Sequence, residues 1–527
     1  MIRTIAGIGV AALLPGVVFG QSTGPAPTFE LADLHASAKS NSPYMSGGVL
    51  RGGRYDIKNA TMLELIQTAY SIDDTIKIVG GPPWLNTDRF DIAAKVPPAT
   101  PPDALKLMLQ ALLADRFKLV VHMDNRPLSV FVLSLGKGKP KLKEADDSGN
   151  SGCQGQAQNP APGETPYNAV SCHMTMEAFA QALRRLGAGY LFGLVVDQTG
   201  LKGSWDFDLK WTPRPQLANA GTSGITIFDA VDKQLGLKLE AKNVPLPVIV
   251  VDSVNQKPTD NPPGVTTSLP PPPPAEFEVA SIRPSAPGAP QNGKIQNGRL
   301  DLQGWPLKSL IEIAWDINND DRLAGAPKFL DSAKFDVTAK ASITQIDDED
   351  LILMLRALLV DRFKLAAHME DRPVSTYTLT AAKPKLQHAD PSNRSECKDG
   401  PGADGKDPRI ANPVLNRLVT CHNMTMAQLA EEFQHFAGGY IQYSVVDATG
   451  IDGAYDFTLS FSGAGLFRTS TGRGGDTGAG GANASEPSGA LSLFDAVNKQ
   501  LGLKLELQKR PVPVLVIDHV EEKPTDN

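Results

Sequence analysis

Apolar residues recur at helical spacing in the first part of each half of the chain. They follow the i, i+3, i+4, i+7 rule that is typical of a helix with one buried face. Each half contains two such helices, separated by a Gly/Pro turn and a short strand at residues 90–95 or 335–340. With an opening strand, at residues 277–282 in the second half, and two closing strands, the pattern predicts a small α+β unit. The apolar positions are Met62, Leu65, Ile66, Ala69, Leu105, Met108, Leu109, Leu112, Leu113 and Phe117 in the first half, and Leu307, Leu310, Ile311, Ala314, Leu351, Met354, Leu355, Leu358, Leu359 and Phe363 in the second.

A second set of patterns follows in each half and predicts another small α+β unit. Thr425 and Gln428 have the spacing of a capping box at a helix start, and Thr175 holds the N-cap position in the first half. The sequence VVDxTGxxGxxDF then predicts a strand pair joined by a tight glycine turn. A helix (FDAVxKQLGL) and two strands (LKLE and PVxVxVID) complete the unit. The Pro-x-Pro between these strands is consistent with a hairpin tip or a sheet edge.

The two halves are copies of one pattern. Residues 113–127 (LADRFKLVVHMDNRP) return as residues 359–373 (LVDRFKLAAHMEDRP), and KPTDN at 257–261 returns as the last five residues. We therefore predict an α+β fold of two homologous repeats, each made of two small units with helices packed on short, mostly antiparallel sheets. A residue kept in both copies is a candidate for the function that they share.

The composition of the chain places the domain boundaries. Repeat 1 covers residues 29–261, repeat 2 covers residues 277–527, and a Pro-rich linker (262–276) joins them. Five consecutive prolines favour a stiff polyproline II spacer, so we expect two separate bodies held at a distance. A Gly-rich segment, residues 462–490, interrupts repeat 2, and its composition is typical of a flexible surface loop.

The overall charge narrows the class of partner. The chain has 527 residues and a formal net charge of −7 at pH 7. An acidic balance argues against a nucleic-acid partner, because binding to nucleic acid needs a concentrated basic surface. The length is too great for one core and predicts several domains.

The first 20 residues have the pattern of a secretory signal peptide. Arg3 is followed by an apolar segment, residues 5–19, that is too short and too interrupted by Gly and Pro to span a bilayer comfortably. An N-terminal anchor is the alternative interpretation. No later stretch approaches ~18 continuous apolar residues. We therefore predict an exported mature chain without a transmembrane helix, either periplasmic or secreted.

Four cysteines divide evenly between the repeats: Cys153 and Cys172, then Cys397 and Cys421. In an exported protein this placement predicts one disulfide in each repeat. Closing a loop of ~20 residues stabilises the fold by about 3 kcal/mol in the chain-entropy model. The bracketed loops are rich in Pro, Gly and Asn and supply little packing, so a covalent link there has a physical purpose.

Four histidines occupy matching positions in the repeats. His122 and His368 follow the DRFKL motif, and His173 and His422 each follow a second cysteine, with methionines close by. His, Cys and Met together suit a soft metal such as copper. The alternative is a disulfide with partly exposed strand histidines and core methionines, since a disulfide-bonded cysteine is no thiolate ligand. We assign no metal and keep the histidines as a weaker alternative.

Four arginines are the candidate binding residues. Arg116 and Arg362 end the second helix of their repeats, and Arg126 and Arg372 follow just beyond. Guanidinium groups suit carboxylates, so these residues are candidates for contact with an anionic ligand or partner. A cation near a helix C-terminus also complements the helix dipole, and this structural interpretation is favoured.

No reaction signature is present in the sequence. There is no HExxH and no GxSxG, and residues 288–295 (GAPQNGKI) lead into a strand instead of the helix that a phosphate loop needs. Asp197 and Asp447 have no second duplicated acid opposite them, so we interpret them as turn-stabilising residues. The sequence predicts no cofactor and no catalytic residue, and it leans against an enzyme.

The motifs in combination resemble a known family. FEVASIRPS, LRALLVDRFKL, VVDATGIDGAYDF and FDAVNKQLGLKLE are similar to those of an acidobacterial paralogous family of uncharacterised exported proteins, domain of unknown function 3738. The resemblance covers nearly all of both repeats and implies export. It implies no activity, substrate or catalytic residue.

These observations lead to one main hypothesis. We expect a non-enzymatic, bivalent binding or interaction protein of the cell envelope, with two similar heads on a spacer and an envelope protein or extracellular ligand as its partner. The alternatives are an envelope hydrolase with an unrecognised site and a copper-type metal-binding protein.

Overall fold

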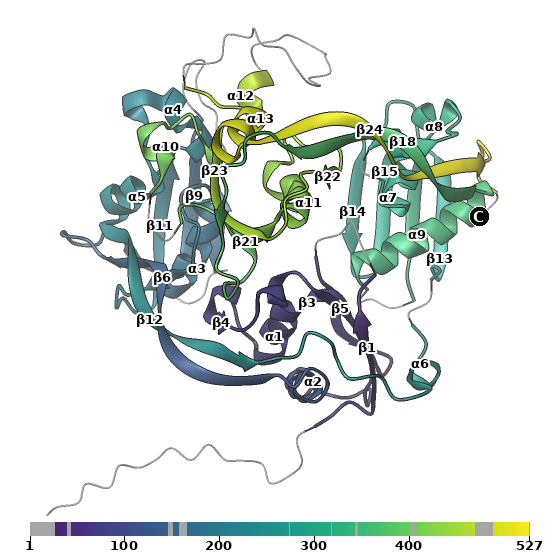
Figure 1. Ribbon diagram of the computed structural model, residues 1–527, viewed down its shortest axis with the longest axis horizontal. Helices are drawn as coiled ribbons and strands as arrows, with labels where there is room; N and C mark the ends of the chain where they lie inside the picture. The colour runs from purple at the N-terminus through teal and green to yellow at the C-terminus, as the bar shows by residue number, and fades with distance from the viewer. Residues whose placement is uncertain are drawn as a thin grey trace, which may run out of the picture.

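Each half of the chain folds into a dumbbell of two α+β units joined by a long two-stranded ribbon (Figure 1). The computed structural model describes residues 27–38, 44–145, 151–156, 166–272, 275–317, 319–342, 346–402, 406–468 and 489–525. The predicted signal peptide, and all but the ends of the predicted Gly-rich loop, lie outside these residues. The α+β class is confirmed, and the same arrangement of sheets occurs twice.

The first unit of each repeat is a four-stranded antiparallel sheet with two helices. The strand order is β1-β5-β3-β2 in repeat 1 and β13-β17-β15-β14 in repeat 2. The helices bury the predicted apolar stripes. The elements are β1 (Leu31–Ala36), β2 (Ser46–Arg51), β3 (Arg54–Thr61), α1 (Met62–Tyr70), β5 (Arg89–Lys95) and α2 (Pro102–Arg116), then β13 (Val279–Pro284), β14 (Asn292–Gln296), β15 (Arg299–Pro306), α7 (Leu307–Ala314), β17 (Lys334–Lys340) and α9 (Asp348–Phe363).

The second unit of each repeat is a smaller antiparallel sheet covered by helices. The strand order is β7-β11-β9-β8 in repeat 1 and β19-β23-β21-β20 in repeat 2. Thr175 caps α3 and the Thr425–Gln428 capping box starts α11, as predicted. The elements are β7 (Lys143–Ala145), β8 (Gly152–Gly155), β9 (Asn168–Thr175), α3 (Met176–Leu186), β11 (Ser204–Trp211) and α5 (Ile227–Ala230), then β19 (Gln387–His388), β20 (Glu396–Asp399), β21 (Arg417–Thr425), α11 (Met426–Ala437), β23 (Ala454–Phe461) and α13 (Leu493–Ala496).

A single long strand runs out to the second unit and another runs back. They are β6 (Val120–Leu135) and β12 (Leu237–Ser253) in repeat 1, and β18 (Ala366–Ala381) and β24 (Leu503–His519) in repeat 2. Each pair is antiparallel along its length, and short strands add in parallel near its ends: β4 (Ile78–Gly80) and β10 (Val195–Asp197), then β16 (Leu323–Ala324) and β22 (Val445–Asp447).

Two details of the predicted strands are therefore wrong. The Pro-x-Pro is no hairpin tip, because Pro127 lies opposite Pro245 in the middle of the ribbon and Pro247 lies two positions further on. These prolines occupy alternate ladder positions. At such positions the N–H group of any other residue would point away from the partner strand, so the prolines cost no ladder hydrogen bond. The VVDxTGxxGxxDF strands also do not pair with each other: β10 pairs with β6, and β11 pairs with β9.

A glycine is required where a π-helical turn leads into the return strand of the ribbon. Gly236 and Gly502 have φ angles of 70° and 68°. A Cβ on Gly236 would lie 2.7 Å from the carbonyl oxygen of Lys139, and one on Gly502 would lie 1.7 Å from that of Lys383. Backbone atoms cannot yield as a side chain can, which explains why KQLG recurs unchanged.

The first units of the two repeats have the same core. Phe90 packs edge-on against Phe117 with ring centroids 4.8 Å apart, and Phe335 against Phe363 at 4.9 Å, both with an interplanar angle of 76°. All four rings are buried. Edge-to-face pairs of this kind add to the stabilisation that comes from area burial alone.

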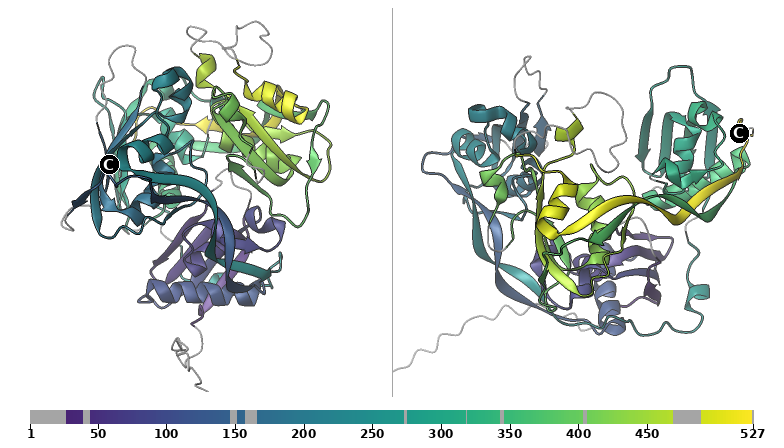
Figure 2. Two further views of the ribbon diagram at one scale, coloured as in Figure 1. Left: turned by 90° about the vertical axis from the view of Figure 1, so that its left-hand side faces the viewer. Right: turned by 45° about the horizontal axis from the view of Figure 1, so that its top comes forward.

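The two repeats pack against each other. In Figure 2 the green and yellow second unit of repeat 2 lies beside the blue second unit and above the purple first unit of repeat 1. Asn86 Nδ2 donates to the carbonyl oxygen of Ser395 (3.1 Å), and Arg51 pairs with Asp350 (3.1 Å). The expectation of two bodies held apart by the linker is wrong, because these contacts join them directly.

The described part of the linker also contacts repeat 1. It includes a helical turn, α6 (Val265–Ser268), whose Val265 is buried. The carbonyl oxygen of Pro270 accepts a hydrogen bond from Arg54 (2.6 Å). The chain between the repeats therefore follows the surface of the first unit of repeat 1.

Candidate functional site

A groove separates the two units of each repeat. In repeat 2 it forms a cavity of about 500 Å³ whose lining residues all belong to that repeat. We call it the repeat-2 groove. Its lining residues are Asn319, Asp320, Gln434, Ile441, Gln442 and Tyr443.

In repeat 1 the matching groove faces a strand of repeat 2. Its walls and the edge strand β20 together enclose a cavity of about 570 Å³, which we call the inter-repeat cleft. The matching positions of the repeat-1 groove are Asp74, Thr75, Arg184, Leu191, Phe192 and Gly193. All six line the cleft, and the residues of β20 form the opposite wall. The chain thus places one of its own strands over this groove.

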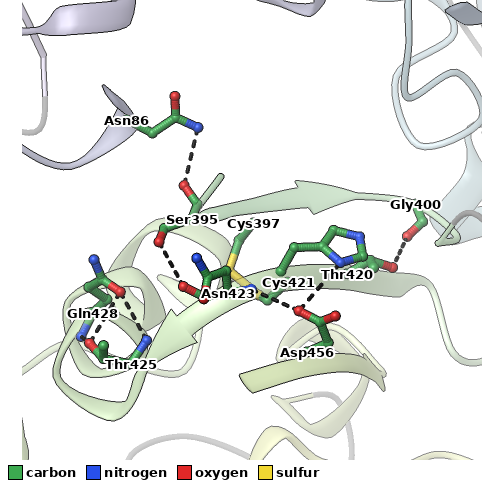
Figure 3. The surroundings of a disulfide bond; sticks show 11 residues. Asn86, Ser395, Cys397, Gly400, Thr420, Cys421, Asn423, Thr425, Gln428 and Asp456 are labelled. Carbon is green, nitrogen blue, oxygen red and sulfur yellow. Dashed lines mark hydrogen bonds and ion pairs between the residues drawn. A yellow bond between two sulfur atoms is a disulfide. The ribbon is translucent and has the colours of Figure 1, made fainter. Parts of the chain in front are cut away.

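The segment that enters β20 is anchored to backbone atoms of repeat 1. The amide of Ser395 donates to the carbonyl oxygen of Pro83 (3.4 Å), and its own carbonyl accepts from Asn86 (3.1 Å; Figure 3). Arg394 donates to the carbonyl oxygen of Ile78. Burial lowers the pKa of the Arg394 guanidinium. In each of these contacts the acceptor is a main-chain carbonyl oxygen of the other repeat.

Phe192 is the apolar centre of this contact. A Cβ on Gly400 would lie 2.6 Å from Phe192 Cγ, so the glycine backbone lies directly against the ring. The guanidinium of Arg409 lies 4.5 Å from the centroid of the same Phe192 ring. Arg409 is itself buried and paired with Asp407 (2.7 Å). A partly desolvated cation near an aromatic face is stabilising.

A second contact joins the first units of the repeats through charges. Arg51 pairs with Asp347 (2.9 Å) and Asp350 (3.1 Å), and Lys58 also pairs with Asp350 (3.1 Å). The Arg51 and Asp350 side chains are each only 10 % exposed. Removing Arg51 would leave Asp350 with only the more exposed Lys58 as its partner, so a nearly buried carboxylate would lose most of its compensation.

The residues of both contacts differ between the repeats. Where repeat 1 has Phe192, Arg51 and Lys58, repeat 2 has Gln442, Gln296 and Gln303. Where repeat 2 has Arg394 and Gly400, repeat 1 has Asn150 and Gln156. Each repeat therefore uses a different surface, and the contact is heterologous in the sense of head-to-tail association.

The inter-repeat cleft is lined by charges of both signs. Arg184 pairs with Asp74, Lys398 with Glu396 (2.6 Å) and Arg417 with Asp399 (3.3 Å). Next to it, Arg214 donates to the carbonyl oxygen of Arg409 (3.4 Å), and burial with the nearby Arg409 lowers the pKa of Arg214. The cleft thus offers cations and carboxylates around one space.

The repeat-2 groove has a different character. Three of its lining side chains are amides, and its single carboxylate, Asp320, pairs with Lys308 (2.9 Å). Lys308 lowers the pKa of Asp320, while burial and Asp320 raise the pKa of Glu312 behind it to about 6. Apart from this compensated pair, the groove presents neutral hydrogen-bonding groups.

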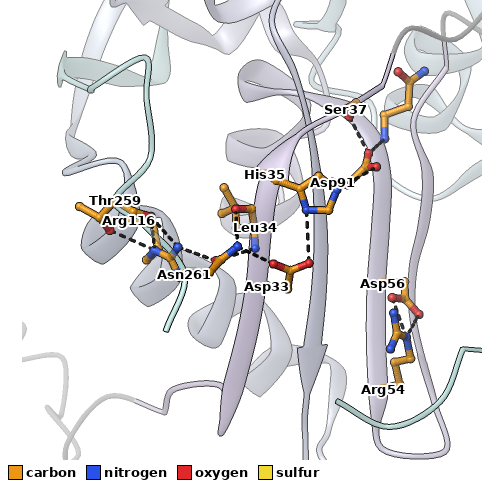
Figure 4. Close-up of polar contacts among 11 residues, drawn as sticks. Asp33, Leu34, His35, Ser37, Arg54, Asp56, Asp91, Arg116, Thr259 and Asn261 are labelled. Carbon is orange, nitrogen blue, oxygen red and sulfur yellow. Dashed lines mark hydrogen bonds and ion pairs between the residues drawn. The ribbon is translucent and has the colours of Figure 1, made fainter. Parts of the chain in front are cut away.

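Arg116 holds the C-terminal segment of its own repeat in place (Figure 4). Its Nε donates to the hydroxyl of Thr259 (3.0 Å), and its Nη2 donates to the side chain of Asn261 (2.6 Å). Asn261 in turn accepts from the amide of Leu34 on β1 (3.0 Å). In repeat 2 the amide of Thr525 donates to the carbonyl oxygen of Arg362 (2.8 Å). The duplicated DRF and KPTDN motifs therefore meet in both repeats, and the side-chain contacts support a structural role for Arg116.

Replacing Arg116 by methionine should lower the free energy of unfolding by about 2 kcal/mol. The change removes the buried charged donor from the Thr259 and Asn261 acceptors, and hydrogen bonds to a charged group contribute more than neutral ones. Arg126→Met is the matched control and should cost less than about 0.5 kcal/mol, as is usual for an exposed ion pair. Urea unfolding of both variants measures the difference. Equal losses of unfolding free energy would contradict the structural role of Arg116.

The other candidate arginines lie on the exposed ribbons. Arg126 pairs with Asp124 (2.6 Å) and Arg372 with Glu370 (2.7 Å), each on its own strand. They do not line either cavity. The structure does not bring them together with Arg116 or Arg362 at a common pocket among the described residues.

The four candidate histidines each face an aspartate. His122 Nδ1 lies 2.8 Å from Asp252, and His368 lies 2.8 Å from Asp518, both across a ribbon. His173 lies 2.8 Å from Asp206 and His422 lies 3.7 Å from Asp456, both across the second-unit sheets. Within the described residues, no three His, Cys, Asp or Glu side chains form a group that could hold a metal ion.

Each repeat contains one disulfide, as the sequence predicts. Cys153 is bonded to Cys172, and Cys397 to Cys421. Each bond links directly opposed residues of an edge strand and its neighbour. Cys397 also lines the inter-repeat cleft, so the second disulfide holds the strand that covers the repeat-1 groove.

The residues that build the cleft were missed in the sequence because they occur in one copy only. Phe192, Arg394, Gly400 and Arg409 have no duplicated partner, and the internal comparison gave weight to residues kept in both copies. The signal that could have found them is a change of residue chemistry between aligned positions of the two repeats. Phe192 in repeat 1, for example, aligns with Gln442 in repeat 2. Asp197 and Asp447, in contrast, accept from the amides two residues on, and so stabilise turns as interpreted.

Comparison with known proteins gives one match. A family model described as a protein of unknown function (DUF3738) matches residues 63–254 and 308–520, which is more than half of the chain. No curated protein and no solved structure matches. The two matched regions confirm the resemblance seen in the motifs and its tandem duplication. Over the residues that are described, the helices all lack the length or the apolar character needed to cross a bilayer.

Proposed function

The chain belongs to the DUF3738 family, and we propose that it is an exported, non-enzymatic interaction protein that binds an extended polypeptide segment in the repeat-2 groove. The observation that carries the proposal is the matching groove of repeat 1, which is covered by a polypeptide edge, strand β20, on the opposite side of the inter-repeat cleft. Addition of an extended segment to a preformed surface is a recurring mode of peptide recognition.

The chemistry of the two grooves supports a different partner for each. The repeat-1 groove contains Asp74 and Arg184, and the strand over it carries Glu396, Lys398 and Asp399. A charged groove therefore meets a charged strand. The repeat-2 groove is rich in amides, which donate to and accept from a peptide backbone. The partner whose chemistry fits this groove is an extended segment of an envelope protein with uncharged polar side chains.

The proposal changes the valency that the sequence suggested. One groove is covered by the chain itself, so two similar repeats leave one groove for a partner. Export is supported by the N-terminal pattern of residues 1–20 and by the two disulfides, since disulfides persist in oxidising compartments.

A photo-cross-linking side chain at position 442 of the full exported chain tests the proposal. We expect cross-links in intact cells to one short segment of one envelope protein, and their loss when Gln434 is replaced by glutamate. A cross-linker at position 192 is the matched control and should react within the chain, with residues near Gly400.

Three outcomes would overturn the proposal. They are no adduct at position 442, scattered adducts that Gln434→Glu does not remove, and an adduct to β8 of a second copy of this chain. The last result would assign the groove to self-association.

A further inference from the structure

One wall of the repeat-2 groove is a short helical turn, η6 (Asp320–Arg322), together with the residue before it. Asn319 and Asp320 line the groove from the first unit, and the other lining residues belong to the second unit. Arg322 holds the turn to the ribbon by donating to the carbonyl oxygen of Pro513 (3.2 Å). Asp320 holds it to α7 by pairing with Lys308 (2.9 Å). The position of this wall therefore depends on how firmly Asp320 is held.

Three carboxyl groups compete for one lysine behind the wall. Lys308 Nζ lies 2.9 Å from Asp320 and 3.3 Å from Asp331, but 4.0 Å from Glu312 Oε1. We call these four residues the Lys308 cluster. Glu312 Oε1 is buried and has no hydrogen bond among the described residues. An ionised carboxylate in this position lacks the donors that would compensate for its lost hydration. The geometry therefore favours the neutral, protonated form of Glu312.

Glu312 and Asp320 share the proton that this requires. Their carboxyl groups lie within hydrogen-bonding reach of each other, and two carboxyl groups form such a bond only when one of them is protonated. Burial and the neighbouring Asp320 raise the pKa of Glu312 to about 6, whereas Lys308 lowers the pKa of Asp320. Glu312 is thus the group that carries the proton. It donates to the same Asp320 carboxylate that Lys308 holds.

Charged groups of the surrounding elements are bound elsewhere. Arg356 of α9 donates to the carbonyl oxygen of Ala314 (2.7 Å), and Lys509 of β24 faces Asp321 of the turn (3.9 Å). Within the part of the chain that the structure describes, the charges that act on Glu312 are those of its three neighbours in the Lys308 cluster.

The Lys308 cluster occurs in repeat 2 only. Its four positions correspond in repeat 1 to uncharged residues, which are Leu63, Gln67, Thr75 and Asn86. Repeat 1 is also the repeat whose groove faces β20. The titratable cluster therefore stands at the groove that we assign to a partner, and its counterpart is absent from the groove that faces the chain itself.

From this arrangement we infer that pH controls the repeat-2 groove: the proton shared by Glu312 and Asp320 fastens the turn at residues 320–322 to α7, and loss of this proton loosens the wall and weakens binding in the groove. When the proton leaves, the two carboxylates repel each other beside one lysine. The effect on the wall belongs to the chain alone, whereas the effect on binding rests on the proposed function.

The direction of the effect follows from the raised pKa of Glu312. The fastening is complete below the ordinary glutamate pKa of 4.5 and is lost as the pH rises through about 6. The pKa of Asp320 is lowered from its ordinary value of 3.8 by Lys308, so its own contribution is lost only in stronger acid. The groove should therefore be firm in mild acid and loose at neutral pH.

Hydrogen exchange of the full, disulfide-bonded chain without a partner tests the effect on the wall. The amide of Arg322 donates to the carbonyl oxygen of Asn319 (2.9 Å) when the turn is formed. Relative to intrinsic exchange at each pH, protection of amides 320–323 should fall about tenfold between about pH 4.5 and about pH 7. Glu312→Gln introduces the residue of repeat 1, which cannot ionise, and should remove this dependence.

Two controls accompany this measurement. Asp331→Asn removes a carboxylate of the Lys308 cluster but leaves the Glu312–Asp320 pair, so the fall in protection should remain. The matching turn of repeat 1, η1 (Thr75–Lys77), is observed in the same sample and should show no such fall. The same pH profile in the unaltered chain and in Glu312→Gln, or in the turns of both repeats, would overturn the inference.

Photo-cross-linking from position 442 at the same two pH values tests the effect on binding. The yield of adducts should fall several-fold at the higher pH in the unaltered chain, and it should stay constant in Glu312→Gln. Equal yields at both pH values in the unaltered chain would refute control of binding. No adduct at either pH would overturn the proposed function and the control of binding with it, while hydrogen exchange would still decide the effect on the wall.

Discussion

Replacing Gly400 by alanine should lower the free energy of unfolding by about 3 kcal/mol, as the sum of two effects. Gly400 has a φ of 109°, a backbone conformation that an L side chain rarely adopts. The new Cβ would also lie 2.6 Å from Phe192 Cγ, so the ring or the whole β20 segment must move. The first effect is local, whereas the second acts between the repeats. Urea unfolding followed by tryptophan fluorescence measures the total.

A matched glycine separates these two effects. Gly453 has a φ of 91°, and a Cβ there would meet nothing within 4 Å. Gly453→Ala should therefore show the backbone strain alone, about 1–2 kcal/mol. The remaining cost of Gly400→Ala should shrink by at least about 1 kcal/mol when Phe192→Ala is already present, because the two side chains are coupled. Equal costs in both backgrounds would mean that β20 does not lie on Phe192.

Removing either disulfide should cost about 3 kcal/mol of stability in the chain-entropy model, since the linked cysteines are 19 and 24 residues apart. The two losses should differ in their consequences. Cys397 and Cys421 hold the strand that covers the repeat-1 groove, whereas Cys153 and Cys172 hold the matching strand of repeat 1, β8, which does not line the cleft. Only the first pair should loosen the contact between the repeats.

Paired Cys→Ala variants and hydrogen exchange measure this difference. In the variant without the Cys397–Cys421 bond, amides of the segment 394–400 and of repeat 1 around residues 188–194 should both lose protection. In the variant without the Cys153–Cys172 bond, loss of protection should stay in β8 and β9, and the amides of residues 188–194 should keep their protection. A loss around residues 188–194 of the same size in both variants would contradict the assignment of β20 to the repeat-1 groove.

The asymmetry of the two grooves gives a physical account of the duplication. If both repeats carried the residues of this head-to-tail contact, each chain would leave one groove and one complementary strand exposed. Separate chains could then join through these two surfaces and form fibres. Here the outer ends have lost the matching groups, since Gln442 stands where repeat 1 has Phe192 and Gln296 stands where it has Arg51. The contact is therefore specific to the two repeats of one chain.

Much of the fold could be predicted from local patterns. The helix stripes from Leu307 to Ala314, the caps at Thr175 and Thr425, and the two disulfides depend on residues close in sequence, whose effects are local. The long ribbons could not be predicted in this way. Pro127 and Pro245 look like strand breaks until the register shows that they face each other, because a proline is tolerated or excluded by its place in a ladder.

The sequence by itself determined the repeated α+β units, the family, and the positions that both copies keep, because hydrophobic periodicity and covalent links are written along the chain. Two of those shared positions serve the fold: Arg116 holds the KPTDN segment, and Gly236 lies where the backbone leaves no room for a Cβ. Only the tertiary structure decided that repeat 2 covers the groove of repeat 1. That contact depends on residues far apart in sequence, such as Phe192 and Gly400, whose complementarity exists only when two folded surfaces meet.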